Sequence, residues 1–186
     1  MTTRRYYRLW AVGLSALLVA LVLAALVAPS YFTRPTPDSL TFEPLSRAES
    51  AEDRSARNAI RLDLDNDLRN ARLLARTANA TYLLFHDPVR GVCLVAALNA
   101  SDLRTACRQV SELKNGGLWV EYGDSTTGDS FLAVAVPVEY GDARVDTDGK
   151  ILSRTRGFVL VQTAGRRMTR FVLRSSKYSD LIVNAR

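Results

Sequence analysis

The most prominent hydrophobic pattern in the chain is an uncharged apolar run from Leu9 to Ala28. A helix of twenty residues is about 30 Å long, which matches the hydrocarbon thickness of a bilayer. Three arginines precede the run, and only Arg34 follows it nearby. Because basic residues collect on the cytoplasmic side, the pattern predicts a transmembrane helix over residues 9–28, a cytoplasmic N-terminus over residues 1–8 and an extracytoplasmic C-terminal part.

A cleaved signal peptide shares the basic start and the apolar run, so it is the alternative. Its apolar region is usually about 7–15 residues long, which is shorter than this run. Pro29 disfavours cleavage directly after Ala28, whereas a cut after Ser30 stays open. We therefore expect an uncleaved membrane anchor.

Residues 29–46 contain several prolines and hydroxyl side chains. Proline favours extended chain and removes backbone donors. This stretch is therefore predicted to be a linker outside the core. Its juxtamembrane residues Tyr31, Phe32 and Pro35 are candidate contacts for a partner in or on the membrane.

From about Arg47 to Ala78, apolar residues recur at the spacing of one helical face, at Ile60, Leu64, Leu68, Ala71 and Ala75. Charged residues fill much of the remainder. The period of 3.6 predicts a long amphipathic helix that needs a surface to pack against. Asn79 is a suitable stop.

Beyond Ala80 the pattern becomes strand-like. The apolar run Val92–Leu98 predicts a strand buried on both faces. Ser101 and Asp102 predict the cap of a short helix over Leu103–Leu113, which Asn115–Gly117 ends. Further strands are expected at 118–122, 131–140, 151–154, 158–163, 168–174 and 181–183. Residues 47–186 are thus predicted to form an α+β domain, with the long helix packed on a mostly antiparallel sheet that carries a small helical insertion.

The sequence offers no recognisable catalytic, cofactor or metal site. It lacks the P-loop, the dinucleotide-binding glycine pattern, the zinc-protease motif and the nucleophile elbow. Two cysteines and one histidine cannot supply the four ligands of a structural zinc site. The histidine, His86, precedes Asp87 and a proline, which is typical of a surface turn. We therefore expect no enzyme and no cofactor.

Cys93 and Cys107 face an oxidising environment if the predicted topology holds. A disulfide between them would close a loop of about 15 residues and stabilise the fold by roughly 3 kcal/mol. Two buried free thiols are the alternative, and the spacing is not that of a redox-active pair.

Charge is distributed unevenly along the chain, whose net charge is +6. From Lys150 onward there are nine bases and only one acid, Asp180. Such a basic segment can meet anionic lipid, a cell-wall polymer or an acidic protein surface, or it can be neutralised internally by the acidic helix. Nucleic acid is not expected outside the cytoplasm. The candidate contact surface comprises Arg154, Arg156, Arg166, Arg167, Arg170, Arg174 and Lys177.

Four short segments carry a resemblance to other proteins: Ala71–Leu74, Gly91–Val95, Cys107 and the Gly117–Leu118 pair. This arrangement resembles small, largely uncharacterised, membrane-anchored extracytoplasmic proteins of high-GC Gram-positive, actinobacterial bacteria. The resemblance implies the same membrane topology and a disulfide, and it implies no catalytic residue.

These features predict a single-pass plasma-membrane protein whose extracytoplasmic domain serves in interaction. It would act as an accessory subunit, assembly factor or scaffold of a membrane or cell-envelope complex. The alternative is an extracytoplasmic ligand-binding module for anionic lipid or cell-wall polymer, whose binding would weaken as salt is added.

Overall fold

The computed structural model describes residues 34–60, 70–98, 102–124, 127–163 and 170–183. The chain divides into two units, Met1–Pro35 and Thr36–Arg186. The predicted transmembrane helix over residues 9–28 lies outside the described residues. Within the described ranges, no helix has the length and apolar character needed to cross a membrane.

All described helices and strands belong to the second unit. The α-helices are α2 (Glu43–Ser46), α3 (Ala51–Ala59) and α4 (Val110–Gly116), and Val138–Tyr140 form a 3₁₀ turn, η2. The strands are β1 (Arg72–Arg76), β2 (Thr81–Asp87), β3 (Gly91–Ala97), β4 (Leu103–Arg108), β5 (Leu118–Gly123), β6 (Ser130–Ala135), β7 (Arg144–Thr147), β8 (Lys150–Arg154), β9 (Phe158–Thr163), β10 (Phe171–Arg174) and β11 (Leu181–Val183).

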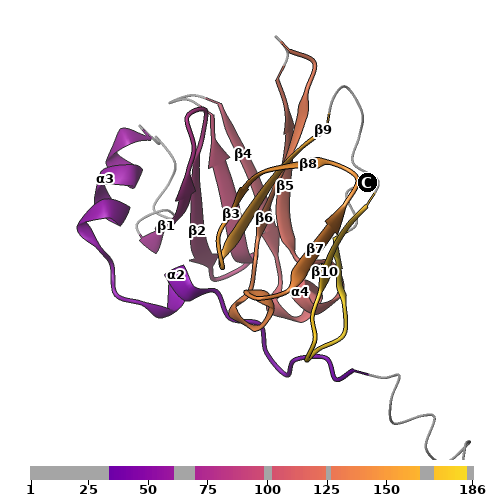
Figure 1. The fold of residues 1–186 in the computed structure, drawn as a ribbon. Coiled ribbons are helices and arrows are strands. Elements are labelled where there is room, and N and C mark those ends of the chain that lie inside the picture. The colour runs from indigo at the N-terminus through magenta and orange to yellow at the C-terminus, as the bar shows by residue number, and fades with distance from the viewer. Residues whose placement is uncertain (1–33, 61–69, 99–101, 125–126, 164–169, 184–186) are drawn as a thin grey trace, which may run out of the picture. The chain divides into compact units, whose positions relative to one another are not determined.

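These strands form three antiparallel sheets (Figure 1). Sheet A has the order β1-β2-β3-β4, sheet B has the order β5-β6-β9-β8, and sheet C has the order β11-β10-β7. The predicted α+β class is therefore wrong. The described part of the chain is mostly β structure with only short helices.

The long amphipathic helix predicted from Arg47 to Ala78 is not formed. Only α3 is α-helical among the described residues of this range, and Arg72–Arg76 form strand β1 instead. Leu73 pairs with Leu83 of β2, so its apolar side chain joins a sheet. The helix preference of Ala, Leu and Arg amounts to well under 1 kcal/mol per residue, which burial and strand pairing outweigh.

The predicted helix over Leu103–Leu113 is also corrected. Its first half is strand β4, which pairs with β3 in a register that sets Cys107 opposite Cys93. Helix α4 begins only at Val110. The predicted stop is confirmed, because Gly117 ends α4 with a positive φ of 61°.

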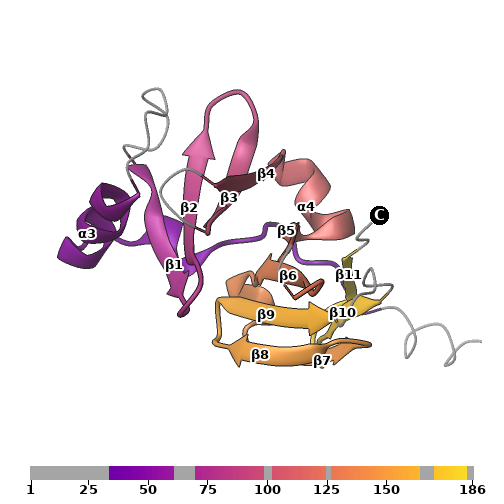
Figure 2. The same cartoon turned by 90° about the horizontal axis from the view of Figure 1, so that it is seen from above.

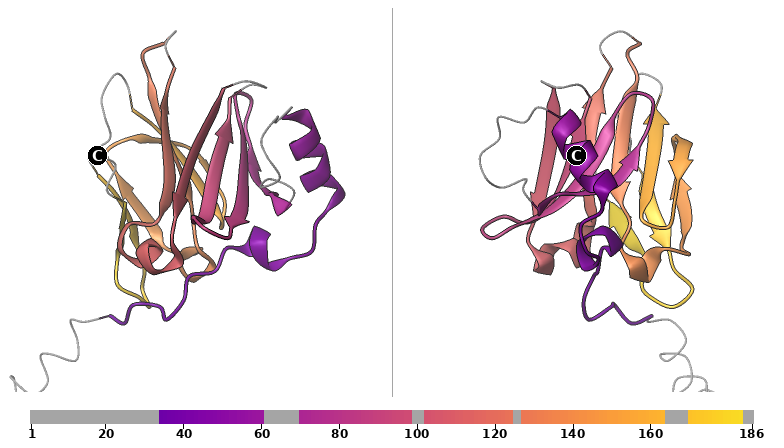
Figure 3. Two further views of the ribbon diagram at one scale, coloured as in Figure 1. Left: turned by 180° about the vertical axis from the view of Figure 1, so that it is seen from behind. Right: turned by 90° about the vertical axis from the view of Figure 1, so that its left-hand side faces the viewer.

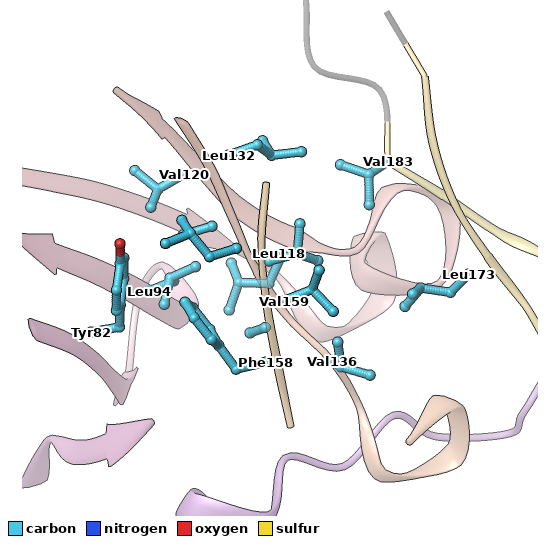
Figure 4. Packing of buried hydrophobic residues seen from close by; sticks show 14 of the residues in the cluster. Tyr82, Leu94, Leu118, Val120, Leu132, Val136, Phe158, Val159, Leu173 and Val183 are labelled. Carbon is cyan, nitrogen blue, oxygen red and sulfur yellow. The ribbon is translucent and has the colours of Figure 1, made fainter. Parts of the chain in front are cut away.

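Sheets A and B pack face to face around the main core. Seen from above, the strands of sheet A stand apart from β6, β9 and β8 of sheet B (Figure 2). The rings of Tyr82 on β2 and Phe158 on β9 lie 4.6 Å apart between centroids. Leu94 of sheet A and Leu173 and Val183 of sheet C belong to the same buried cluster (Figure 4). One core therefore joins all three sheets.

A second, smaller cluster lies on the other face of sheet A, where α3 packs (Figure 3). Ala56 and Ile60 from α3 and its C-cap meet Leu83, Phe85 and Cys93 there. The central strands of sheet A are consequently covered on both faces, and β3 is buried along its whole length, as the apolar run Val92–Leu98 predicted.

The segment before α2 contributes to the core as well. Leu40 and Phe42 are buried in the main cluster. The backbone N–H and side-chain hydroxyl of Thr41 both donate to the carboxylate of Glu139. The prediction that residues 29–46 form a linker outside the core is therefore wrong for this part of the segment.

Candidate functional site

The strongest candidate site is a pocket of about 430 Å³ between sheets A and B, which we call the inter-sheet pocket. Its volume falls within the range of small-ligand sites. Sheet A contributes the β1–β2 turn, the end of β3 and the residue before β4, while sheet B contributes all four strands and the residue after β5. The lining residues are Thr77, Ala78, Asn79, Leu98, Asp102, Tyr122, Gly123, Asp124, Phe131, Leu152, Ser153 and Leu160.

An aromatic pair forms one side of this pocket. Tyr122 and Phe131 sit opposite each other in the β5–β6 register. Their rings are stacked, with centroids 5.3 Å apart and an angle of 18° between the planes. Because directly opposed residues share a face, both rings lie on the side of sheet B that carries Phe158 and faces sheet A.

The hydroxyl of Tyr122, a residue of the pocket lining, meets the hydroxyl of Tyr82 at 2.5 Å. Burial raises the pKa of both hydroxyls above the usual value for tyrosine, and for Tyr122 the contact with Tyr82 raises the pKa further. Both tyrosines are therefore neutral hydrogen-bonding groups at physiological pH. Their contact links β2 of sheet A to β5 of sheet B.

The charged residues of the pocket lining are acidic. Asp102 and Asp124 come from the chain segments at the ends of β3 and β5, and the lining contains no lysine or arginine. Asp102 forms an ion pair with Arg104, whose Nε lies 3.2 Å from its carboxylate. The pocket thus combines aromatic and aliphatic walls with two carboxylates.

A second pocket, of about 420 Å³, lies between β1 and the β8–β9 turn. Leu74, Val136 and Val138 provide apolar walls, and the charges of Glu43 and Arg156 oppose each other in sign. Its lining therefore favours neither cations nor anions.

The described arginines of the predicted contact surface are engaged within the domain. Arg170 and Arg174 both approach the carboxylate of Asp146 at 2.7 Å, and Arg174 also pairs with Asp180 at 3.0 Å. These ion pairs hold the pKa of Asp146 below its usual range. Arg170 and Arg174 thus lie close together beside Asp146 of sheet C.

The remaining members of that surface lie elsewhere. Arg154 donates to the carbonyl of Ala143, and Arg156 pairs with Asp142 at 3.2 Å. Lys177 is exposed in the segment after β10. Arg166 and Arg167 lie outside the described residues.

Of the juxtamembrane arm, Tyr31 and Phe32 lie outside the described residues. Pro35 is exposed and belongs to the first unit.

The two cysteines are brought together directly. The sulfur atoms of Cys93 and Cys107 lie at disulfide-bonding distance, 2.00 Å, across neighbouring strands of sheet A. Cys93 is fully buried, in the cluster beneath α3. The disulfide thus joins β3 to the outer strand of its sheet.

His86 is exposed on β2 and is not part of the pocket lining. Across the described ranges, no group of three or more His, Cys, Asp or Glu side chains is arranged to hold a metal ion.

Sequence reasoning did not find the inter-sheet pocket. Tyr122 and Phe131 belong to segments predicted as strands, but their stacking follows from the β5–β6 pairing and not from a local motif. Ala78 and Leu152 are 74 positions apart in the chain and meet the same cavity. The site becomes apparent only when sheets A and B are packed against each other. No protein-family model, curated protein or solved structure matches the chain.

Proposed function

We propose that this protein is an extracytoplasmic interaction protein that serves as an accessory subunit, assembly factor or scaffold, and that the inter-sheet pocket receives part of its partner protein. The observation that carries the proposal is the pocket itself, because aromatic and aliphatic side chains line it around a few polar groups. That composition is typical of recognition sites.

The chemistry of the lining favours binding over catalysis. Its titratable side chains are Tyr122, Asp102 and Asp124. The raised pKa of Tyr122 keeps this hydroxyl protonated, so it is a poor base or nucleophile near neutral pH. Asp102 already accepts an ion pair from Arg104. These three side chains can serve as hydrogen-bonding and charged contacts, which is what a binding surface requires.

Two observations support a place outside the cytoplasm. Cys93 and Cys107 lie at disulfide-bonding distance, and disulfides persist mainly in oxidising compartments. The arginines before the apolar run Leu9–Ala28 favour a cytoplasmic N-terminus. In this proposal the apolar run attaches the protein to the plasma membrane.

The test is capture of the partner with a matched pair of variants. Tagged full-length protein is crosslinked in native membranes and purified in mild detergent, and its partners are identified by mass spectrometry. Ala78→Trp places a bulky ring at an exposed residue of the pocket lining. Val89→Trp adds the same ring to the β2–β3 turn, at the opposite end of sheet A, where Val89 is 81% exposed.

We expect a stoichiometric partner with wild-type protein and Val89→Trp, and its loss with Ala78→Trp. Recovery of wild-type protein alone would overturn the proposal. A partner that Ala78→Trp retains would overturn the role of the pocket.

A further inference from the structure

The charged side chains in the lining of the inter-sheet pocket indicate the charge of a ligand that would fit there. Its lining contains the carboxylates of Asp102 and Asp124 and no basic side chain. Both acids have contacts within the domain, and one contact of Asp102 is the ion pair with Arg104. An anionic ligand would nevertheless meet two acids there. A cationic group is the complementary occupant.

The stacked rings of Tyr122 and Phe131 favour the same kind of occupant. A ring face attracts a cation through its quadrupole, most strongly where water is partly excluded. Both rings are half-buried and line the cavity between the sheets. Acids and rings together suit the guanidinium of arginine or the ammonium of lysine, whose aliphatic stems would cover Leu160 and Leu98.

The position of the pocket indicates how such a side chain arrives. Leu152 and Ser153 belong to β8, which is an edge strand of sheet B in the described part of the chain. The outer edge of a sheet presents backbone groups that an extended segment can pair with. Leu152 is 42% exposed and provides an apolar contact beside that edge.

The edge is short and irregular, which limits what backbone pairing can contribute. The β8–β9 register shifts between Ile151 and Ser153. A bulge interrupts a regular ladder. Specificity must therefore come from the side chain in the pocket and not from a long run of added strand.

We propose that the inter-sheet pocket binds a lysine or arginine side chain of an extended partner segment that lies along β8. This inference rests on the proposed function and specifies its ligand.

The test uses random linear heptapeptides displayed on phage and selected against full-length protein, with Ala78→Trp as the counter-selection. Peptides that require an open pocket should be enriched in lysine or arginine. Replacing that residue by glutamine in the synthetic peptide should weaken binding at least about tenfold, as should Asp124→Asn. Asp142→Asn is the control, because Asp142 is an 85% exposed acid outside the pocket lining.

Each other outcome has a distinct meaning. Pocket-dependent peptides without a preference for basic residues would overturn the charge selection while leaving the proposed function intact. If N-acetylarginine amide binds as tightly as the peptides, a small cation suffices for binding. That result would overturn the proposal that the ligand is an extended segment. If no peptide distinguishes wild-type protein from Ala78→Trp, this inference is overturned, and partner capture still decides the proposed function.

Discussion

The carboxylate of Asp53 accepts the backbone N–H of Leu73 at 2.7 Å and so ties α3 to the edge strand β1. The same carboxylate accepts two hydrogen bonds from the guanidinium of Arg47, at 2.6 and 2.9 Å, and caps its own helix through Ser50. Asp53 is fully buried. One charged side chain therefore replaces the missing neighbour of an edge strand and stabilises a helix start.

Asp53→Asn should lower the free energy of unfolding by about 3 kcal/mol at pH 7, because it leaves Arg47 without its buried counter-charge. The bonds from Arg47, Ser50 and Leu73 hold the pKa of Asp53 well below its usual value. Its contribution is therefore complete above about pH 4 and is lost as the pH falls below that value. Urea unfolding at pH 7, 5 and 3 should show the wild-type advantage shrinking towards acid.

Glu52→Gln is the matched control, since Glu52 is an exposed acid in the same helical turn. It should change the free energy of unfolding by no more than about 0.5 kcal/mol. Equal effects of the two substitutions would contradict the role of Asp53.

Replacing Cys93 and Cys107 together by alanine should destabilise the oxidised protein by roughly 3 kcal/mol, because the bond closes a loop of about 15 residues. For a chain of this size that corresponds to a fall in melting temperature of about 6–12 °C. The single change Cys93→Ser should also lower the melting temperature of the oxidised protein. Thermal unfolding with and without dithiothreitol checks this, and a wild-type protein indifferent to reductant would refute the stabilising disulfide.

Gly91→Ala should be far more harmful than Gly128→Ala. Both glycines have positive φ, 86° and 72°, which costs an alanine about 1 kcal/mol. A Cβ on Gly91 would also collide with the carbonyl oxygen of Arg108 and lie 2.9 Å from the Cα of Gln109, whereas one on Gly128 meets nothing within 4 Å. Chemical unfolding should show an additional loss of about 2 kcal/mol for Gly91→Ala alone.

Tyr122 should remain protonated in the folded protein at pH 11, because burial and the contact with Tyr82 raise its pKa. Tyrosinate absorbance at that pH should therefore be the same in wild-type protein and Tyr122→Phe, and should differ by one tyrosine only after denaturation. The unfolded chain ionises near pH 10, so stability should fall as the pH rises above that value. A native difference at pH 11 would contradict the burial.

Segments with strong local signals were predicted well. Residues 92–97 of the apolar run Val92–Leu98 belong to the fully buried strand β3, and Asn115–Gly117 does end a helix. The Phe131–Tyr140 strand stops at Ala135, where Val136 and Pro137 lead into a 3₁₀ turn. In each case the residue type itself decides the local structure, because glycine and proline restrict the backbone and a run of apolar side chains favours burial.

The misassigned segments share a different property. Arg72–Arg76 and Leu103–Arg108 contain residues acceptable to both helix and strand, so their state depends on partners elsewhere in the chain. Arg72–Arg76 form a strand because they pair with β2, and Leu103–Arg108 form a strand because they pair with β3. The register that sets Cys107 opposite Cys93 contributes to the second pairing. A local pattern cannot report such pairings.

The amino-acid sequence alone predicted the main turns and the strands of sheet B, because these follow from neighbouring residues, and it favoured a Cys93–Cys107 disulfide over two free thiols. Tertiary structure decided the β architecture, the burial of Leu40 and Phe42, and the inter-sheet pocket. The physical reason is one of scale. Helix and strand preferences differ by fractions of a kcal/mol per residue, whereas burying an apolar side chain in a core is worth about 1.5–3 kcal/mol.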